Sequence, residues 1–183
     1  MVKKFIGSAA LTTDTSGLAT SVMTTKGDLA TYSTSRVRIG IGNNSDIFVA
    51  DSGEATGNKW TANTTSFVLA CSDETTALTT GTKITFRMPY AYTVTAVRAS
   101  LTTAGTGANL VTVDINESGT TILSTEITID ATETTSTTAA TAPVIDDPDL
   151  ANDAEMTVDV DQVDSGGVSA GLKVYIIGYR VAH

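Results

Sequence analysis

Two stretches of the chain alternate between apolar and polar residues, and this period of two constrains the fold more than any other feature. Residues 111–115 read Val-Thr-Val-Asp-Ile, and residues 156–163 read Met-Thr-Val-Asp-Val-Asp-Gln-Val. Successive side chains of a β-strand point to opposite faces, so each stretch buries one face and exposes the other. This pattern is typical of antiparallel sheets that pack one face on a core.

Threonine extends the same preference over the whole chain, because roughly a fifth of the 183 residues are threonine. Its β-branched side chain is stiff at χ1 and suits the pleated, half-buried surface of a strand. Charged residues make up only 17 % and aromatic residues 5 %, whereas charged residues usually reach about 25 % in globular domains. No stretch shows a convincing helical period, so we predict an all-β chain.

Residues 66–183 contain further short apolar stretches separated by turn signals rich in Gly, Asp and Ser. We predict strands at residues 66–70, 83–88, 92–101, 110–116, 121–123, 127–129, 156–163 and 172–181. This number of short strands in one domain is typical of a jelly-roll-like antiparallel β-sandwich. An immunoglobulin-like sandwich is the alternative, although the Cys…Trp…Cys pattern of that fold is absent.

Residues 1–65 show little periodicity and many glycines. The stretch 37–41 alternates like a strand, residues 42–45 favour a tight turn, and residues 47–50 are expected to form the return strand. One such hairpin is too small to bury a core by itself. We therefore predict an extended N-terminal arm with a β-hairpin element, which needs the second segment, other copies or an underlying surface as a partner.

The charge of the chain excludes two classes of partner. The formal net charge is −9 and the sequence pI is about 4.4. Nucleic acids and anionic membrane surfaces both require basic patches, so we expect neither as a partner. Insertion into a membrane is not expected either, because no apolar run approaches the roughly 20 residues of a spanning helix.

Catalytic residues are scarce. A nucleophile needs a base within hydrogen-bond reach, and the only histidine is His183. The single cysteine, Cys71, lies in an apolar stretch and is expected to be a small buried residue. Gly40 and Gly42 lack the third glycine and the following helix of a phosphate loop. We therefore expect no enzyme activity and no cofactor.

One acidic loop leaves a question about metal binding open. Loops rich in carboxylates can bind Ca²⁺, although the spacing here is not that of an EF-hand. The alternative is a solvated acidic turn bent by Pro148. We expect no metal site, and the sequence does not decide whether this loop binds calcium. Its four aspartates are Asp146, Asp147, Asp149 and Asp153.

Residues 24–60 contain three short motifs in a distinctive order. They are Thr24-Thr-Lys-Gly-Asp-Leu-Ala-Thr31, then Arg36-Val-Arg-Ile-Gly40, then Val49-Ala-Asp-Ser-Gly-Glu-Ala-Thr-Gly-Asn-Lys-Trp60. This order resembles an element of phage tail-fibre and other virion proteins, which opens with TKGDL, turns at ADS and ends with ATGxKW. The chain departs from that element by replacing its common GQVL with residues 43–49. Residues 66–183 resemble small β-sandwich domains of phage structural proteins in pattern.

The resemblance implies an accessory protein on the surface of a tailed-phage virion. We expect a homotrimeric capsid decoration (cement) or head-fibre protein that binds the major capsid protein on the phage head, with its sandwiches packed about a three-fold axis. The alternative is a short tail fibre or receptor-binding protein that contacts tail proteins and a host surface receptor. Trp60 is expected to anchor a small core or to lie at a subunit interface. The expected assembly contacts are Lys26, Asp28, Leu29, Ile39, Ile41, Phe48 and Trp60.

Overall fold

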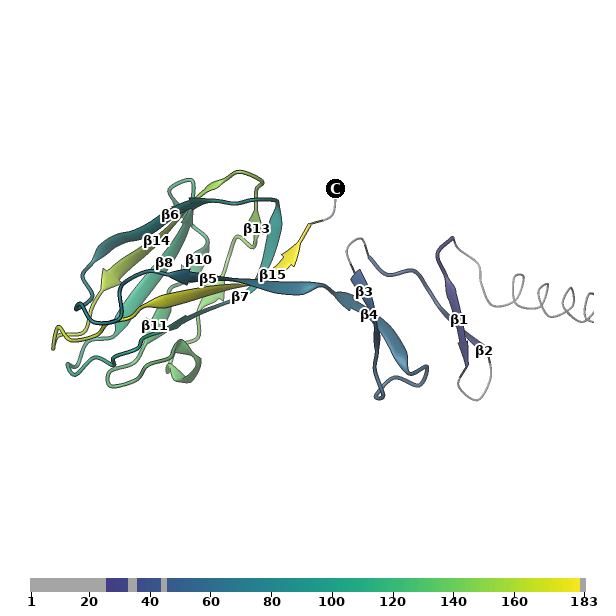
Figure 1. Ribbon diagram of the computed structural model, residues 1–183, viewed down its shortest axis with the longest axis horizontal. Helices are drawn as coiled ribbons and strands as arrows, with labels where there is room; N and C mark the ends of the chain where they lie inside the picture. Colours follow the sequence, from purple (N-terminus) through teal and green to yellow (C-terminus); the bar gives the residue numbers. More distant parts are fainter. Residues whose placement is uncertain (1–25, 33–35, 44–45, 182–183) are drawn as a thin grey trace, which may run out of the picture. The chain divides into compact units, whose positions relative to one another are not determined.

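The computed structural model describes residues 26–32, 36–43 and 46–181, and in these ranges it contains strands, one 3-10 helix and no α-helix. Two compact units divide the chain, residues 1–63 and residues 64–183 (Figure 1). The predicted all-β fold is confirmed. The two units differ in the contacts that stabilise them.

Residues 64–183 form an antiparallel β-sandwich of two main sheets. The first sheet has the strand order β11-β8-β14-β6, and the short β9 pairs with β8. Its strands are β6 (Gly81–Arg87), β8 (Val111–Glu117), β9 (Thr120–Thr121), β11 (Ile127–Ile129) and β14 (Glu155–Gln162). The sandwich is the fold class that the period of two predicted.

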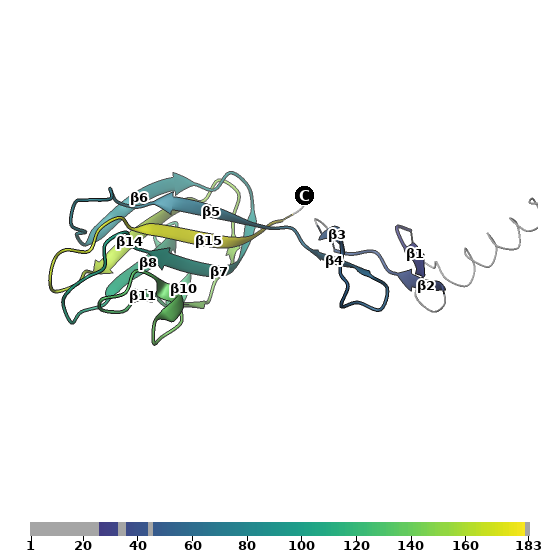
Figure 2. The ribbon, with the colours of Figure 1, turned by 60° about the horizontal axis from the view of Figure 1, so that its bottom comes forward.

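The second sheet has the order β13-β7-β15-β5, and Figure 2 shows β5, β15 and β7 side by side. Its strands are β5 (Thr64–Ala70), β7 (Tyr92–Ser100), β13 (Asp149–Leu150) and β15 (Lys173–Arg180). A separate ribbon pairs β10 (Leu123–Thr125) with β12 (Val144–Ile145), and the 3-10 helix η1 covers Ser136–Thr138.

The core of the sandwich comes from the apolar positions of the alternating strands. In β8 and β14 the alternate apolar residues are buried, and of the residues between them only Asp114 is also buried. The same alternation holds for β15 on the opposite sheet. Adjacent strands supply the central layer of this core: Val111, Val113, Ile115, Met156, Val158, Val160, Val174 and Ile176.

One buried carboxylate holds two loops of the sandwich together. Asp164 accepts hydrogen bonds from the backbone N–H groups of Thr106 (3.3 Å), Val168 (3.5 Å) and Ser169 (3.1 Å). Burial alone raises the pKa of Asp164, but donors from Ser169, Thr106 and Val168 outweigh it and bring the pKa down to about 2. Gly105 is required beside it, because a Cβ there would lie 2.5 Å from the Asp164 Cβ.

Residues 1–63 contain two β-hairpins within their described part. Strand β1 (Leu29–Tyr32) pairs with β2 (Arg36–Ile39), and β3 (Asp46–Ala50) pairs with β4 (Asn58–Ala62). The loop between β3 and β4 is closed by Asp51, whose backbone N–H donates to Gly57 O at 2.8 Å. Its carboxylate also pairs with Lys59, with 2.5 Å between Oδ2 and Nζ.

These pairings correct one expectation. The segment 37–41 was expected to pair with residues 47–50 across a turn at 42–45, but β2 pairs back to β1 and β3 pairs forward to β4. The physical reason lies at Gly40 and Gly42, which leave the strand and contact the indole of Trp60. That contact comes from a residue almost twenty positions further along the chain, which a local turn pattern does not reveal.

Candidate functional site

Trp60 joins the two hairpins of the N-terminal unit. Its indole Nε1 donates a hydrogen bond to Gly40 O at 2.8 Å. Its ring packs so closely on Gly42 that a Cβ there would lie 2.7 Å from the ring Cγ. The Phe48 ring, its cross-strand neighbour, lies 4.9 Å away between centroids at 53°. Trp60 therefore anchors the small contact between the two hairpins.

The KGDL segment is held by two further contacts. The side chain of Asp28 is only 1 % exposed, and its Oδ2 lies 3.4 Å from Nη1 of Arg38. Gly27 has a φ of +92°, and a Cβ there would lie 2.6 Å from Cδ1 of Ile41. A side chain at position 27 would thus be strained both by its backbone conformation and by Ile41.

The described part of the N-terminal unit shows no apolar core. Among the side chains described between residues 26 and 63, no hydrophobic one is buried. Every buried hydrophobic residue that the structure describes lies between Cys71 and Ile176, in the sandwich. Small hairpins without a shared core are marginally stable in water. The described hairpins therefore lack the buried apolar layer that stabilises the sandwich.

Four large apolar side chains of this unit are exposed. The exposed fractions are 38 % for Leu29, 60 % for Ile41, 42 % for Ile47 and 41 % for Phe48. We call these four residues the apolar hairpin surface. Three of them were predicted as assembly contacts. Ile47 was not, because an alternating pattern places neighbours on opposite faces, whereas both Ile47 and Phe48 are exposed in a hairpin without a core.

The other predicted assembly residues have different positions. Lys26 is exposed in the turn before β1, and Ile39 is half-buried opposite Leu29. Asp28 is buried, and half-buried Trp60 contacts the glycines of its own unit. The structure thus brings Asp28 and Trp60 to the inside of the unit and leaves the apolar hairpin surface outside.

Charge is also distributed unevenly between the two units. Residues 1–63 contain six Lys or Arg and five Asp or Glu, whereas residues 64–183 contain five and fifteen. The formal charges are therefore +1 and −10, which together give the −9 of the whole chain. Like charges oppose close approach. Contacts between copies are thus electrostatically easier through the N-terminal unit than through the sandwich.

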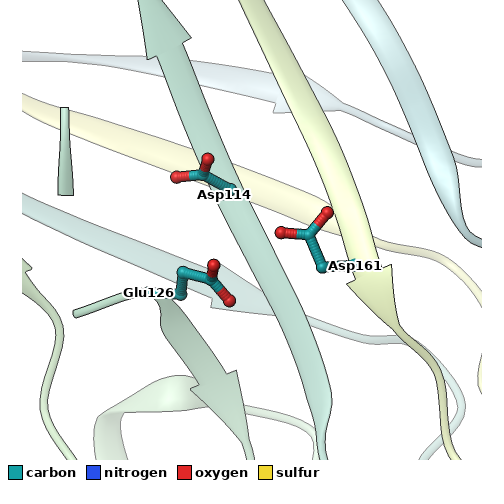
Figure 3. Close-up of side chains that lie close together, drawn as sticks. All are labelled: Asp114, Glu126 and Asp161. Carbon is teal, nitrogen blue, oxygen red and sulfur yellow. The ribbon is translucent and has the colours of Figure 1, made fainter. Parts of the chain in front are cut away.

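A second feature, on the outside of the β11-β8-β14-β6 sheet, is a cluster of three carboxylates (Figure 3). Asp114 in β8, Asp161 in β14 and Glu126 just before β11 bring carboxylate oxygens within 4.8 Å of one another. Asp114 is buried, and Thr121 Oγ1 donates to it at 2.5 Å. Its cross-strand neighbour in β14 is another acid, Asp159.

The cluster shifts the proton affinity of two of its members. Burial raises the pKa of Glu126, and the charges of Asp161 and Asp114 raise it further. Burial also raises the pKa of Asp161, as do the charges of Asp114 and Asp159. Oxygen atoms of carboxylates at this spacing are ligands of the kind that Ca²⁺ takes.

The predicted acidic loop behaves differently. Asp146, Asp147, Asp149 and Asp153 do not supply three carboxylates to any one group within the described part of the chain. Asp149 instead accepts a hydrogen bond from Thr93 Oγ1 at 2.8 Å. Sequence reasoning placed Asp159 and Asp161 on the wet face of a strand but missed the cluster, because strand order is needed to bring β8, β11 and β14 together.

The thiol of Cys71 is free and buried in the sandwich. Burial raises the pKa of the Cys71 thiol to about 11, so the thiol is protonated at neutral pH and is a poor nucleophile. His183 lies outside the described residues. Across the described ranges no helix is long and apolar enough to cross a membrane.

Comparison with protein families, with curated proteins and with solved structures finds no match to this chain. The features of the described residues that bear on function are the apolar hairpin surface and the distribution of charge between the two units.

Proposed function

We propose that this chain is a structural protein of a tailed-phage virion, a capsid decoration (cement) or head-fibre protein that binds the major capsid protein as a homotrimer. One observation carries the proposal: the N-terminal unit exposes four large apolar side chains and buries none in its described part. The resemblance of residues 24–60 to virion-protein elements supports the viral setting. The role is mechanical, since the protein acts by making contacts.

The apolar hairpin surface supplies the contacts between copies. Burying apolar surface contributes about 25 cal/mol per Å², and a near-neutral unit adds little repulsion when copies meet. A charge of −10 on each sandwich opposes packing of sandwiches on one another. This proposal moves the trimer contacts to residues 26–62, whereas the sequence led us to expect the sandwiches to pack about the axis.

Sedimentation equilibrium tests the assembly step. We expect the full chain to sediment at three times its mass of 18.9 kDa and residues 64–183 to sediment as a folded monomer. Ile41→Ser and Phe48→Ser are expected to shift the full chain toward monomer. The matched control is Val68→Ser, which removes an equally exposed side chain from the sandwich (57 % exposed) and should leave the trimer intact. A monomeric full chain at high concentration would contradict the proposal.

The location on the virion requires a separate measurement. Gold-labelled antibody against residues 64–183 is expected to decorate the head of the parent particle at many symmetry-related positions. Particles labelled only at the tail would contradict the capsid role and favour the receptor-binding alternative. A variant lacking residues 1–63, added to particles that lack the protein, is expected not to bind.

A further inference from the structure

The outer face of the β13-β7-β15-β5 sheet carries two adjoining cavities that share Arg98 and Thr137. Each has a volume of about 240 Å³. Together we call them the Arg98 groove. Strand register places Arg98 in β7 directly opposite Tyr175 in β15, and these strands lie side by side in Figure 2. The segment around η1 forms the remaining wall.

Arg98 differs from the other basic residues of the sandwich in having no described partner. Each of the others contacts an acceptor, an acid or an aromatic ring: Lys83 contacts Thr79, Arg87 contacts Glu155, Lys173 contacts Glu74 and Arg180 lies over Tyr90. No ion pair or hydrogen bond joins the Arg98 side chain to any residue in the described ranges. Arg98 is thus an exposed residue that lines both cavities, in a unit whose charge is −10.

Four residues that line the same cavity as Arg98 carry hydroxyl groups. Ser100 Oγ and Tyr175 Oη lie 3.2 Å apart, and Thr135 Oγ1 and Thr137 Oγ1 lie 2.9 Å apart. Thr135 Oγ1 also accepts from the Thr137 backbone N–H at 3.2 Å, which fixes this wall. The Tyr175 ring and the Ile177 side chain provide the apolar part of the lining.

We propose that the Arg98 groove binds a carboxylated sugar, such as a uronic acid residue, at the surface of the sandwich. Guanidinium groups bind carboxylates through two parallel hydrogen bonds. Hydroxyl groups both donate and accept, which suits the hydroxyls of a sugar ring, and the Tyr175 ring matches the apolar face of the sugar. A singly charged carboxylate is favoured over a doubly charged phosphate, because the acidic sandwich repels the higher charge more strongly.

Binding at this groove requires neither trimerisation nor a capsid, so it is independent of the proposed assembly role. Saturation-transfer difference NMR on the full chain measures it, with glucuronate as the probe. We expect saturation of the glucuronate ring protons and a dissociation constant on the order of 1 mM, as is usual for a small ligand in a shallow site. Glucose, which lacks the carboxylate, and acetate, which lacks the ring, are expected to bind at least about tenfold more weakly.

Substitutions of groove residues test whether glucuronate binds in the Arg98 groove. Arg98→Gln is expected to weaken glucuronate binding about tenfold or more, and Thr137→Val to weaken it less. Arg87→Gln is the matched control, because it removes an exposed arginine from the other sheet, and it should leave binding unchanged. Three results would overturn the proposal: no transfer to glucuronate, equal transfer to acetate or glucose, or equal loss in Arg98→Gln and Arg87→Gln.

Discussion

The N-terminal unit and the sandwich share one chain and one preference for strands, but they differ in what holds them together. The sandwich buries a continuous layer of Val, Ile, Leu and Met between two sheets. The N-terminal unit relies on one indole packed on two glycines, one buried carboxylate beside an arginine, and one charged loop. Four large apolar side chains of its described part are exposed instead.

Strand content alone therefore does not make a unit stable without contacts from outside it. Burial of apolar surface is the main favourable term in folding. In its described part, the N-terminal unit buries no hydrophobic side chain. A sandwich with a complete core gains little from self-association, and its charge of −10 opposes it. Under the proposed function the N-terminal unit gains most from a neighbour, because its described part buries no hydrophobic side chain. This difference between the two units is the basis of the proposed assembly role.

The largest expected effect on stability comes from a core residue of the sandwich, compared with an exposed residue of the N-terminal unit. Ile115→Ala removes a side chain that is fully buried, and we expect it to lower the free energy of unfolding by about 2–5 kcal/mol. Phe48→Ala, in the N-terminal unit, is expected to cost less than about 1 kcal/mol in dilute solution, because Phe48 is largely exposed. Urea denaturation measures both, followed by far-UV circular dichroism for Ile115→Ala and by Trp60 fluorescence for Phe48→Ala. Equal losses would mean that the N-terminal unit has a core after all.

The second effect concerns the loop carboxylate of the sandwich. Asp164→Ala is expected to cost roughly 2–3 kcal/mol at pH 7, because it leaves buried backbone N–H groups without their charged acceptor. The folded pKa of Asp164, about 2, lies below the ordinary value of 3.8. Its contribution is therefore complete above about pH 4 and is lost as the pH falls toward 2.

Urea titrations at several pH values measure this contribution. The gap between wild type and Asp164→Ala should narrow as the pH falls from 4 to 2. Asp146→Ala, at an exposed position with no described side-chain partner, is the control and should change stability little at any pH. A gap that does not depend on pH would show that Asp164 acts only through packing.

The smallest expected effect is a gain in stability rather than a loss, and it comes from replacing one carboxylate of the acidic cluster. Glu126 has a raised pKa, so the folded state binds its proton more tightly than the unfolded state. Its contribution is favourable only at low pH, and stability is lost as the pH rises through the folded pKa. Glu126→Gln removes the repulsion and is expected to gain a few tenths of a kcal/mol at pH 7.

Thermal unfolding of Glu126→Gln at pH 7 and pH 4 tests this sign. The stabilisation should be present at pH 7 and should vanish below the ordinary glutamate pKa of 4.5. Glu54→Gln, which removes an exposed carboxylate from the N-terminal unit, is the control. A stabilisation of the same size at both pH values would contradict the role of charge in the cluster.

The sequence predicted the sandwich well because its information there is local. Alternation between residues 156 and 163 places Val158 and Val160 on one face of a strand, whatever that strand pairs with. The two-residue strands β12 and β13 were missed, because Pro148 and its neighbouring aspartates indicate a turn. They pair only because Ile145 and Leu150 meet strands that are distant in sequence.

The candidate sites were harder to predict, because each depends on contacts between distant residues. The pairing of the hairpins is decided by Trp60 on Gly42. The acidic cluster joins residues 114, 126 and 161 through the order of three strands. The Arg98 groove exists because the segment around η1 lies beside β7. A single sequence contains these residues but not their neighbours in space.

The most direct test of the central claim uses the fact that Trp60 is the only tryptophan. Its fluorescence reports the N-terminal unit, whereas far-UV circular dichroism reports mainly the larger sandwich. Both are followed during urea unfolding at protein concentrations that differ a hundredfold. If the N-terminal unit is stabilised by neighbouring copies, the Trp60 midpoint rises with concentration while the dichroism midpoint stays fixed. Coincident midpoints that do not depend on concentration would contradict the claim.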